Sequence, residues 1–194
     1  GDALADDDGG IDLLGESGGR CRDGRAGLPE GEAVPKAFYE DRQGQVWTIA
    51  KSANVYRTGD GRTDLVARNL LSLHEDREGS IWIGTTAGLL RLRGLTISHY
   101  SMRDGLSSDN VYSLLRDRHG AVWIGTQSAG LNRYDNGRVS HYGVAQGLPS
   151  NDVTSLYEDR SGRLWVATRG GLSWLDRGRF RRFTAKEAAL SGAV

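Results

Sequence analysis

The sequence contains only one cysteine, three prolines and three lysines among 194 residues. The single cysteine, Cys21, excludes an internal disulfide framework and a multi-thiolate metal site. Basic and acidic residues balance at 25 each, and this lack of net charge argues against nucleic acid as the main partner. No apolar run approaches the roughly 20 residues that span a bilayer. An enzyme, a binding module and an interaction scaffold remain open.

Glycine, in contrast, is abundant, with 28 residues. Much glycine with little proline indicates many tight turns between short ordered elements. An Asp-x-x-Gly motif recurs with its aspartate at positions 7, 41, 76, 117 and 159. Four of the five copies are followed by tryptophan, and the first has Leu13 at that position. The spacing of 34 to 42 residues is typical of a repeat architecture.

Each repeat is predicted to form four short strands. Asp-x-x-Gly places aspartate and glycine where a type I turn prefers them, between a first strand such as 153–157 and a second such as 164–168. The second strand is apolar almost continuously, which indicates cover on both faces. Third and fourth strands are expected at 172–175 and 180–183.

This pattern predicts an all-β fold, a β-propeller of four-stranded antiparallel blades. About five blades are expected, with approximate bounds 1–33, 34–69, 70–110, 111–152 and 153–194. Trp82, Trp123 and Trp165 are expected to be buried between blades.

The ring is predicted to be open, an arc of a larger propeller of about seven blades. Residues 189–194 are similar to 105–111 with one residue fewer, so the chain stops where another blade would start. The alternative is a tight five-bladed ring in which residues 190–194 complete the first blade.

At these residues the chain resembles the two-component regulator propeller repeat. Residues 105–134 follow that family's pattern nearly throughout, from GLSSDNV through WIGT to GLNRY, and 147–172 follow it about as well. The resemblance is strong over about 69–183 and weak over 1–68. It implies a periplasmic sensor region of a bacterial receptor with a histidine kinase or diguanylate cyclase output domain.

The resemblance further implies a non-enzymatic, ligand-sensing module whose ligand is a polar small molecule, with carbohydrate fragments as one class. The full-length receptor would be anchored in the inner membrane and could dimerise, and the module's other partners would be neighbouring blades and the receptor's signalling domains. The alternatives are a propeller enzyme similar to streptogramin lyase, and a non-catalytic protein-interaction scaffold.

Loops at one end of the blades are the expected ligand site, because loops on a rigid scaffold often hold binding groups. Asparagine and aspartate in such loops can instead bond only to the backbone. The candidate ligand-binding residues are Lys51, Thr86, Asp109, Asn110, Gln127, Asn151, Asp152 and Arg169.

No catalytic residue, metal or cofactor is expected. His99 and His141 occupy the same repeat position, which favours a structural role over a catalytic one. The turn aspartates are held apart in separate hairpins, and the arginines after them, including Arg118, are expected to be solvated.

Overall fold

The structure, a computed structural model, describes residues 35–41, 43–59, 62–94 and 96–184. These residues form sixteen strands in four antiparallel sheets, together with two short 3-10 turns. They divide into two compact units, one ending at His99 and one starting at Tyr100. The expected first blade, 1–33, and residues 189–194 lie outside the described residues.

The first unit contains two sheets, here named blades A and B. Blade A consists of β1 (Pro35–Glu40), β2 (Val46–Ala50), β3 (Val55–Gly59) and β4 (Arg62–Ala67). Blade B consists of β5 (Leu70–Glu75), β6 (Ile81–Thr85), β7 (Gly88–Arg93) and β8 (Thr96–Tyr100).

The second unit contains blades C and D. Blade C consists of β9 (Val111–Arg116), β10 (Val122–Thr126), β11 (Leu131–Asp135) and β12 (Arg138–Tyr142). Blade D consists of β13 (Val153–Glu158), β14 (Leu164–Thr168), β15 (Gly171–Asp176) and β16 (Arg179–Arg182).

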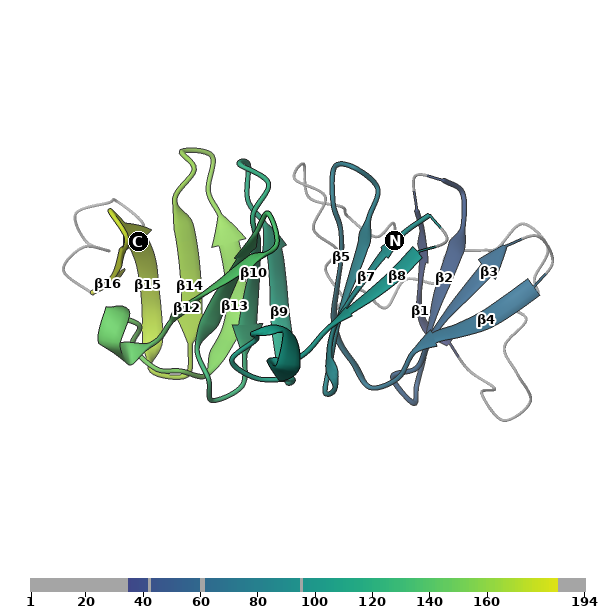
Figure 1. The fold of residues 1–194 in the computed structure, drawn as a ribbon, viewed down its shortest axis with the longest axis horizontal. Helices are drawn as coiled ribbons and strands as arrows, with labels where there is room; N and C mark the ends of the chain where they lie inside the picture. Colours follow the sequence, from purple (N-terminus) through teal and green to yellow (C-terminus); the bar gives the residue numbers. More distant parts are fainter. Residues whose placement is uncertain (1–34, 42, 60–61, 95, 185–194) are drawn as a thin grey trace. The chain divides into compact units, whose positions relative to one another are not determined.

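Each blade is a meander in which consecutive strands pair (Figure 1). The prediction of four-stranded antiparallel blades is confirmed, and the fold is that of a β-propeller. The Asp-x-x-Gly turn joins the first two strands of each blade, and the turn glycines adopt positive φ, for example 75° at Gly79 and 91° at Gly120. Positive φ is the conformation that glycine adopts without steric cost.

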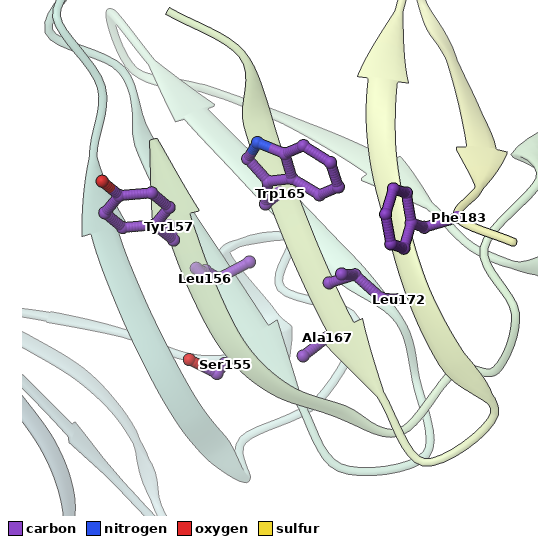
Figure 2. A pocket seen from close by; sticks show the side chains of 7 residues that line it. All are labelled: Ser155, Leu156, Tyr157, Trp165, Ala167, Leu172 and Phe183. Carbon is purple, nitrogen blue, oxygen red and sulfur yellow. The ribbon is translucent and has the colours of Figure 1, made fainter. Parts of the chain in front are cut away.

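The second strand of the blade is buried on both faces, as its continuous apolar pattern predicts. Every residue of β6 and β10 is buried. Trp82 and Trp123 expose only 2% and 3% of their surface, which confirms their expected burial. Trp165 is less buried than these two and falls in the intermediate range, because the face of blade D on which it lies has no blade over it among the described residues of its unit (Figure 2).

Within each unit, two blades pack face to face through one apolar cluster. In the second unit, Trp123 and Leu131 of blade C meet Val153, Leu164 and Val166 of blade D. In the first unit the same repeat positions meet, in the cluster that contains Trp47, Val55, Leu70, Ile81 and Ile83. The two interfaces are therefore repeats of one packing scheme.

The loops that lead into blades C and D each contain a 3-10 turn that was not predicted, η1 (Met102–Asp104) and η2 (Val144–Gln146). Each turn ends at a glycine in the left-handed region, Gly105 and Gly147. At Gly147, with φ of 102°, a Cβ would lie 2.2 Å from the carbonyl oxygen of Phe180, so no larger residue fits without a shift. Leu106 and Leu148 follow and are buried.

Candidate functional site

The repeated turn aspartates could be read from the sequence as acid–base or metal-binding groups. In the structure their carboxylates accept hydrogen bonds that hold the hairpin together. In blade B, Oδ1 of Asp76 accepts the backbone N–H groups of Glu78 and Ser80, at 3.1 and 2.8 Å. Its Oδ2 accepts the indole N–H of Trp82, at 2.8 Å. We call these three hydrogen bonds the aspartate–tryptophan clamp. The sequence predicts the turn but not the bond to the indole, and this bond explains why tryptophan follows the aspartate by six residues.

The clamp recurs in all four blades. An indole N–H donates to the aspartate at 2.8 Å in every case, in the pairs Trp47–Asp41, Trp82–Asp76, Trp123–Asp117 and Trp165–Asp159. A carboxylate that accepts three bonds from its own hairpin is committed to holding that hairpin. Among the described residues, moreover, no group of three or more His, Cys, Asp or Glu side chains is placed to hold a metal ion.

Asp159 also shows what the clamp does to acidity. Burial by itself raises the pKa of this carboxyl, but hydrogen bonds from the side chains of Ser161 and Trp165 and from the backbone of Arg163 and Ser161 outweigh it. The pKa of Asp159 therefore lies well below its ordinary value. Such a group is ionised near neutral pH and is a poor proton donor.

The histidines at the shared repeat position make structural contacts. A ring nitrogen of His99, Nε2, lies 2.9 Å from the carbonyl oxygen of Ala87. Nδ1 of His141 lies 2.8 Å from Oδ1 of Asn132, a residue with no exposed surface. The same Oδ1 accepts the backbone N–H of Ser107, at 3.0 Å. These contacts tie the outer strands to the loops, as expected for structural positions.

Arg118 is exposed, as expected for a turn arginine, but it also bonds to the next blade, which the sequence does not predict. Its Nε donates to Glu158 at 2.7 Å and its terminal nitrogen donates to the carbonyl of Asp159 at 2.8 Å. Glu158 directly precedes the clamp aspartate of the next blade, and Glu75 holds the same place in blade B, where it accepts the hydroxyl of Tyr39. A donor from the preceding blade thus reaches a glutamate in both units, which only the three-dimensional pairing of blades reveals.

The candidate ligand-binding loops of the second unit form one connected edge. The backbone N–H of Gln127 donates to the carbonyl of Asn110, at 3.2 Å, and that of Gly130 donates to Asn151, at 2.8 Å. The backbone N–H of Arg169 donates to the carbonyl of Asp152, at 3.0 Å. The structure therefore brings together six of the eight predicted residues, which are Asp109, Asn110, Gln127, Asn151, Asp152 and Arg169.

Three of these six side chains are used to hold the loops. Asp109 accepts the backbone N–H of Met102 at 2.7 Å, and Asn151 accepts that of Val144 at 3.0 Å, so both fasten a 3-10 turn. Asp152 accepts both the backbone N–H and the hydroxyl of Ser128, at 3.0 and 3.1 Å. Ser128 belongs to the same loop as Gln127 but is not among the predicted site residues, and no residue type in the sequence indicates its positive φ of 65°.

The other three side chains, those of Asn110, Gln127 and Arg169, make no hydrogen bond to the part of the chain that the structure describes. Arg169 is exposed, and Asn110 and Gln127 are half-buried. They stand on loops whose backbone is fixed by the bonds above. In the first unit, Lys51 and Thr86 are exposed in the β2–β3 and β6–β7 turns. The connected edge described above consists of second-unit residues only.

Three segments of the chain match the family described as two component regulator propeller: residues 64–87, 105–128 and 147–170. Among curated proteins, none matches the sequence. In the part of the chain that the structure describes, no helix is long and apolar enough to cross a membrane.

Solved structures share the fold. The chain is similar to the extracellular domain of a protein described as a hybrid two component system of B. thetaiotaomicron, with a TM-score of 0.64, 24% identity, and coverage of 77% of this chain and 23% of that one. An extracellular domain described as part of a one component system of the same organism gives a TM-score of 0.64, 19% identity and coverage of 78% and 25%. The chain is also similar to virginiamycin B lyase from Staphylococcus aureus, with a TM-score of 0.58, 15% identity, and coverage of 76% of this chain and 54% of that one.

At these identities the likeness establishes the propeller fold. The chain spans about a quarter of the length of the two extracellular domains.

Proposed function

Because the chain carries repeats of the two component regulator propeller family, we propose that it is the extracytoplasmic ligand-sensing module of a bacterial signal-transduction receptor. The fold likeness to extracellular domains of such systems supports this role and a periplasmic location. In this proposal the receptor is anchored in the inner membrane, and its kinase or cyclase domain lies on the other side.

The observation that supports ligand binding is that, along the connected loop edge of blades C and D, some polar side chains hold the loops and others make no hydrogen bond. Asp109, Asn151 and Asp152 fix the loops, and Asn110, Gln127 and Arg169 present unbonded donors and acceptors on them. A fixed backbone lowers the entropic cost of ordering such groups around a ligand. Two amides and a guanidinium suit a polar small molecule with many hydroxyl groups, such as an oligosaccharide.

The test is isothermal calorimetry of the purified chain against a panel of oligosaccharides. We expect Gln127→Ala and Arg169→Ala each to weaken binding by about 5- to 30-fold, the equivalent of 1–2 kcal/mol for a lost hydrogen bond. Their melting temperatures should not change, because neither side chain bonds to the protein. Arg138→Ala is the matched control, since Arg138 is an exposed arginine on β12, away from the loop edge.

Asp152→Ala should behave differently, because it releases Ser128 and lowers the melting temperature. If Gln127→Ala and Arg169→Ala bind every sugar as the unchanged chain does, the loop edge is not the site. If no sugar binds, the ligand class is wrong, and a screen of other polar metabolites takes its place.

We also propose that the ligand is bound without turnover. His99 and His141 make structural contacts with a loop and a neighbouring strand, which favours a structural role for both. Incubating the chain with streptogramin and with any sugar found to bind, followed by mass spectrometry, should return each compound unchanged. Cleavage of either would favour the lyase alternative.

A further inference from the structure

Two arginines meet at the loop edge of blade D. Arg169 lies in the β14–β15 turn, and Arg182 is the last residue of β16. A terminal nitrogen of Arg182 donates to the carbonyl oxygen of Gly170, the residue after Arg169, at 2.7 Å. Both arginines are exposed. The turn therefore carries one guanidinium group of its own and is bonded to a second one from the outer strand.

Arg182 faces the loop that leads into blade D. Successive side chains of a strand point to opposite faces, and the next residue, Phe183, lines the uncovered face of the blade (Figure 2). A Cβ at Gly171 would lie 3.9 Å from Nε of Arg182 and 4.0 Å from the Cβ of Pro149, which belongs to that loop. The turn is also packed tightly there, since a Cβ at Gly170 would lie 2.5 Å from the carbonyl oxygen of Pro149. Arg182 therefore lies where a closely packed turn and loop meet.

The repeat shows that this pair of charges is particular to blade D among the second, third and fourth described blades. The same two positions in blades B and C hold residues without a permanent charge, which are Thr86 with His99 and Gln127 with His141. His99 makes the same contact as Arg182, because its Nε2 lies 2.9 Å from the carbonyl oxygen of Ala87 in the β6–β7 turn. One donor is thus enough to fasten the turn. Arg182 has five N–H donors, so its fork exceeds what that contact requires.

Neither guanidinium group is neutralised by a carboxylate in the part of the chain that the structure describes. The side chain of Arg169 makes no hydrogen bond there, and that of Arg182 makes only the bond to Gly170. Asp152 contacts Arg169 through its backbone carbonyl, at 3.0 Å, but its carboxylate accepts the two donors of Ser128 instead. The charge of the pair therefore remains available to an anion from outside.

We propose that Arg169 and Arg182 bind an anionic group of the ligand, a carboxylate or a sulfate on an acidic sugar. This inference rests on the proposed sensing function and narrows its ligand class. The planar guanidinium fork matches two oxygens of such a group with parallel N–H donors. Two like charges in one turn repel each other, and an anion between them removes this repulsion. The amides of Asn110 and Gln127 bind the uncharged hydroxyl groups of the same ligand.

The test compares a galactose trisaccharide with trigalacturonate, with its methyl ester and with a sulfated galactose trisaccharide, by isothermal calorimetry of the purified chain. We expect an acidic trisaccharide to bind at least about 10-fold more tightly than the two neutral ones, because bonds between charged groups are the stronger ones. Its affinity should fall as salt is added, and that of the neutral sugars should not. A preference for trigalacturonate would identify a carboxylate as the bound group, and a preference for the sulfated sugar would identify a sulfate.

Two variants separate the charge from the fold. Arg169→Gln keeps amide donors but removes the charge, so it should weaken the acidic sugar by about 10- to 100-fold and the neutral one by less than about 3-fold. Arg182→His copies His99 of blade B, so the turn should stay fastened and the melting temperature unchanged. At about pH 8, where histidine is uncharged, this variant should also lose affinity for the acidic sugar. Arg179→Gln is the matched control and should change no affinity, because Arg179 is exposed at the opposite end of β16.

The failure of this inference differs from the failure of the proposed function. If neutral and acidic sugars bind equally well, and Arg169→Gln affects both alike, the sensing function stands and the anion site is wrong. If no trisaccharide binds, sodium glucuronate and sodium sulfate serve as probes, with the Nε–Hε signals of the arginines followed by nuclear magnetic resonance. Shifts at Arg169 and Arg182 that galactose does not cause would support the anion site. Unshifted signals would overturn it together with the sugar ligand.

Discussion

The aspartate–tryptophan clamp of blade B allows a quantitative test of what holds each hairpin together. Asp76 is 2% exposed and accepts hydrogen bonds from Glu78, Ser80 and Trp82. Asp76→Ala leaves the buried N–H groups of Ser80 and Trp82 without an acceptor, whereas the exposed Glu78 can turn to water. At about 1–3 kcal/mol for each buried donor, we expect a loss of about 3–5 kcal/mol in the free energy of unfolding.

Asp76→Asn isolates the indole bond. The remaining carbonyl oxygen of Asn can still accept the two backbone N–H groups, but its NH₂ group then faces the indole N–H, donor against donor. The loss should therefore be smaller than for Asp76→Ala, about 1.5–3 kcal/mol. Asp64→Asn is the control, because Asp64 is exposed on β4, and such surface changes stay within about 0.5 kcal/mol.

The assay is urea denaturation, followed by circular dichroism, of the unchanged chain, the single variants, and Asp76→Asn combined with Trp82→Phe. Removing the indole N–H should make Asp76→Asn less costly, which gives a coupling energy of about 1–2 kcal/mol. A coupling below about 0.5 kcal/mol would refute the reasoning, because the indole bond would then contribute nothing measurable. So would an Asp76→Asn variant as unstable as Asp76→Ala.

Four further predictions follow from other features of the structure. Because the pKa of Asp159 is depressed, its stabilising contribution is present above the unfolded value of 3.8 and is lost as the pH falls through the folded value; acid titration of Asp159→Asn should show a weaker loss of stability in that range. Trp123→Ala should cost about 3–5 kcal/mol in a urea titration, and Trp165→Ala less, because only the first is fully buried. Gly147→Ala should destabilise the protein more than Gly137→Ala: both glycines have positive φ, but a Cβ at Gly137 meets nothing within 4 Å, so equal losses would contradict the close approach at Phe180. Arg118→Ala should cost less than about 1 kcal/mol and its effect should shrink at high salt, since the pair with Glu158 is partly exposed.

The blade could be predicted because its signals are local. The turn needs aspartate and glycine three residues apart, and a strand covered on both faces is apolar throughout, as β10 is. The hydrogen bond from the indole of Trp123 to Asp117 was not predicted, because neither residue type by itself indicates which partner its side chain binds. The pair of Arg118 and Glu158 depends on which hairpins meet, and the two residues are forty positions apart.

The loop edge shows a sharper limit. The sequence places Asp109 and Asn110 side by side, and both looked equally suited to a ligand. In the structure the side chain of Asp109 is bound to the backbone of Met102, and that of Asn110 is left unbonded. Which of two neighbours is occupied depends on the path of the η1 loop, and no pattern of residue types encodes that path uniquely.

The spacing within the clamp has a consequence for how such proteins change over generations. Every bond of the clamp joins residues at most six positions apart, so all of its parts lie within one short stretch of the gene. A duplication or deletion of that stretch moves acceptor, turn and indole together, and the copied hairpin is locked wherever it lands. Only the side chains that pack against the two neighbouring blades must then fit new partners, as in other repeat proteins whose units touch only adjacent units. Lineages can therefore add or remove units while the loops at the other end of the blades, which take no part in the clamp, change independently of it.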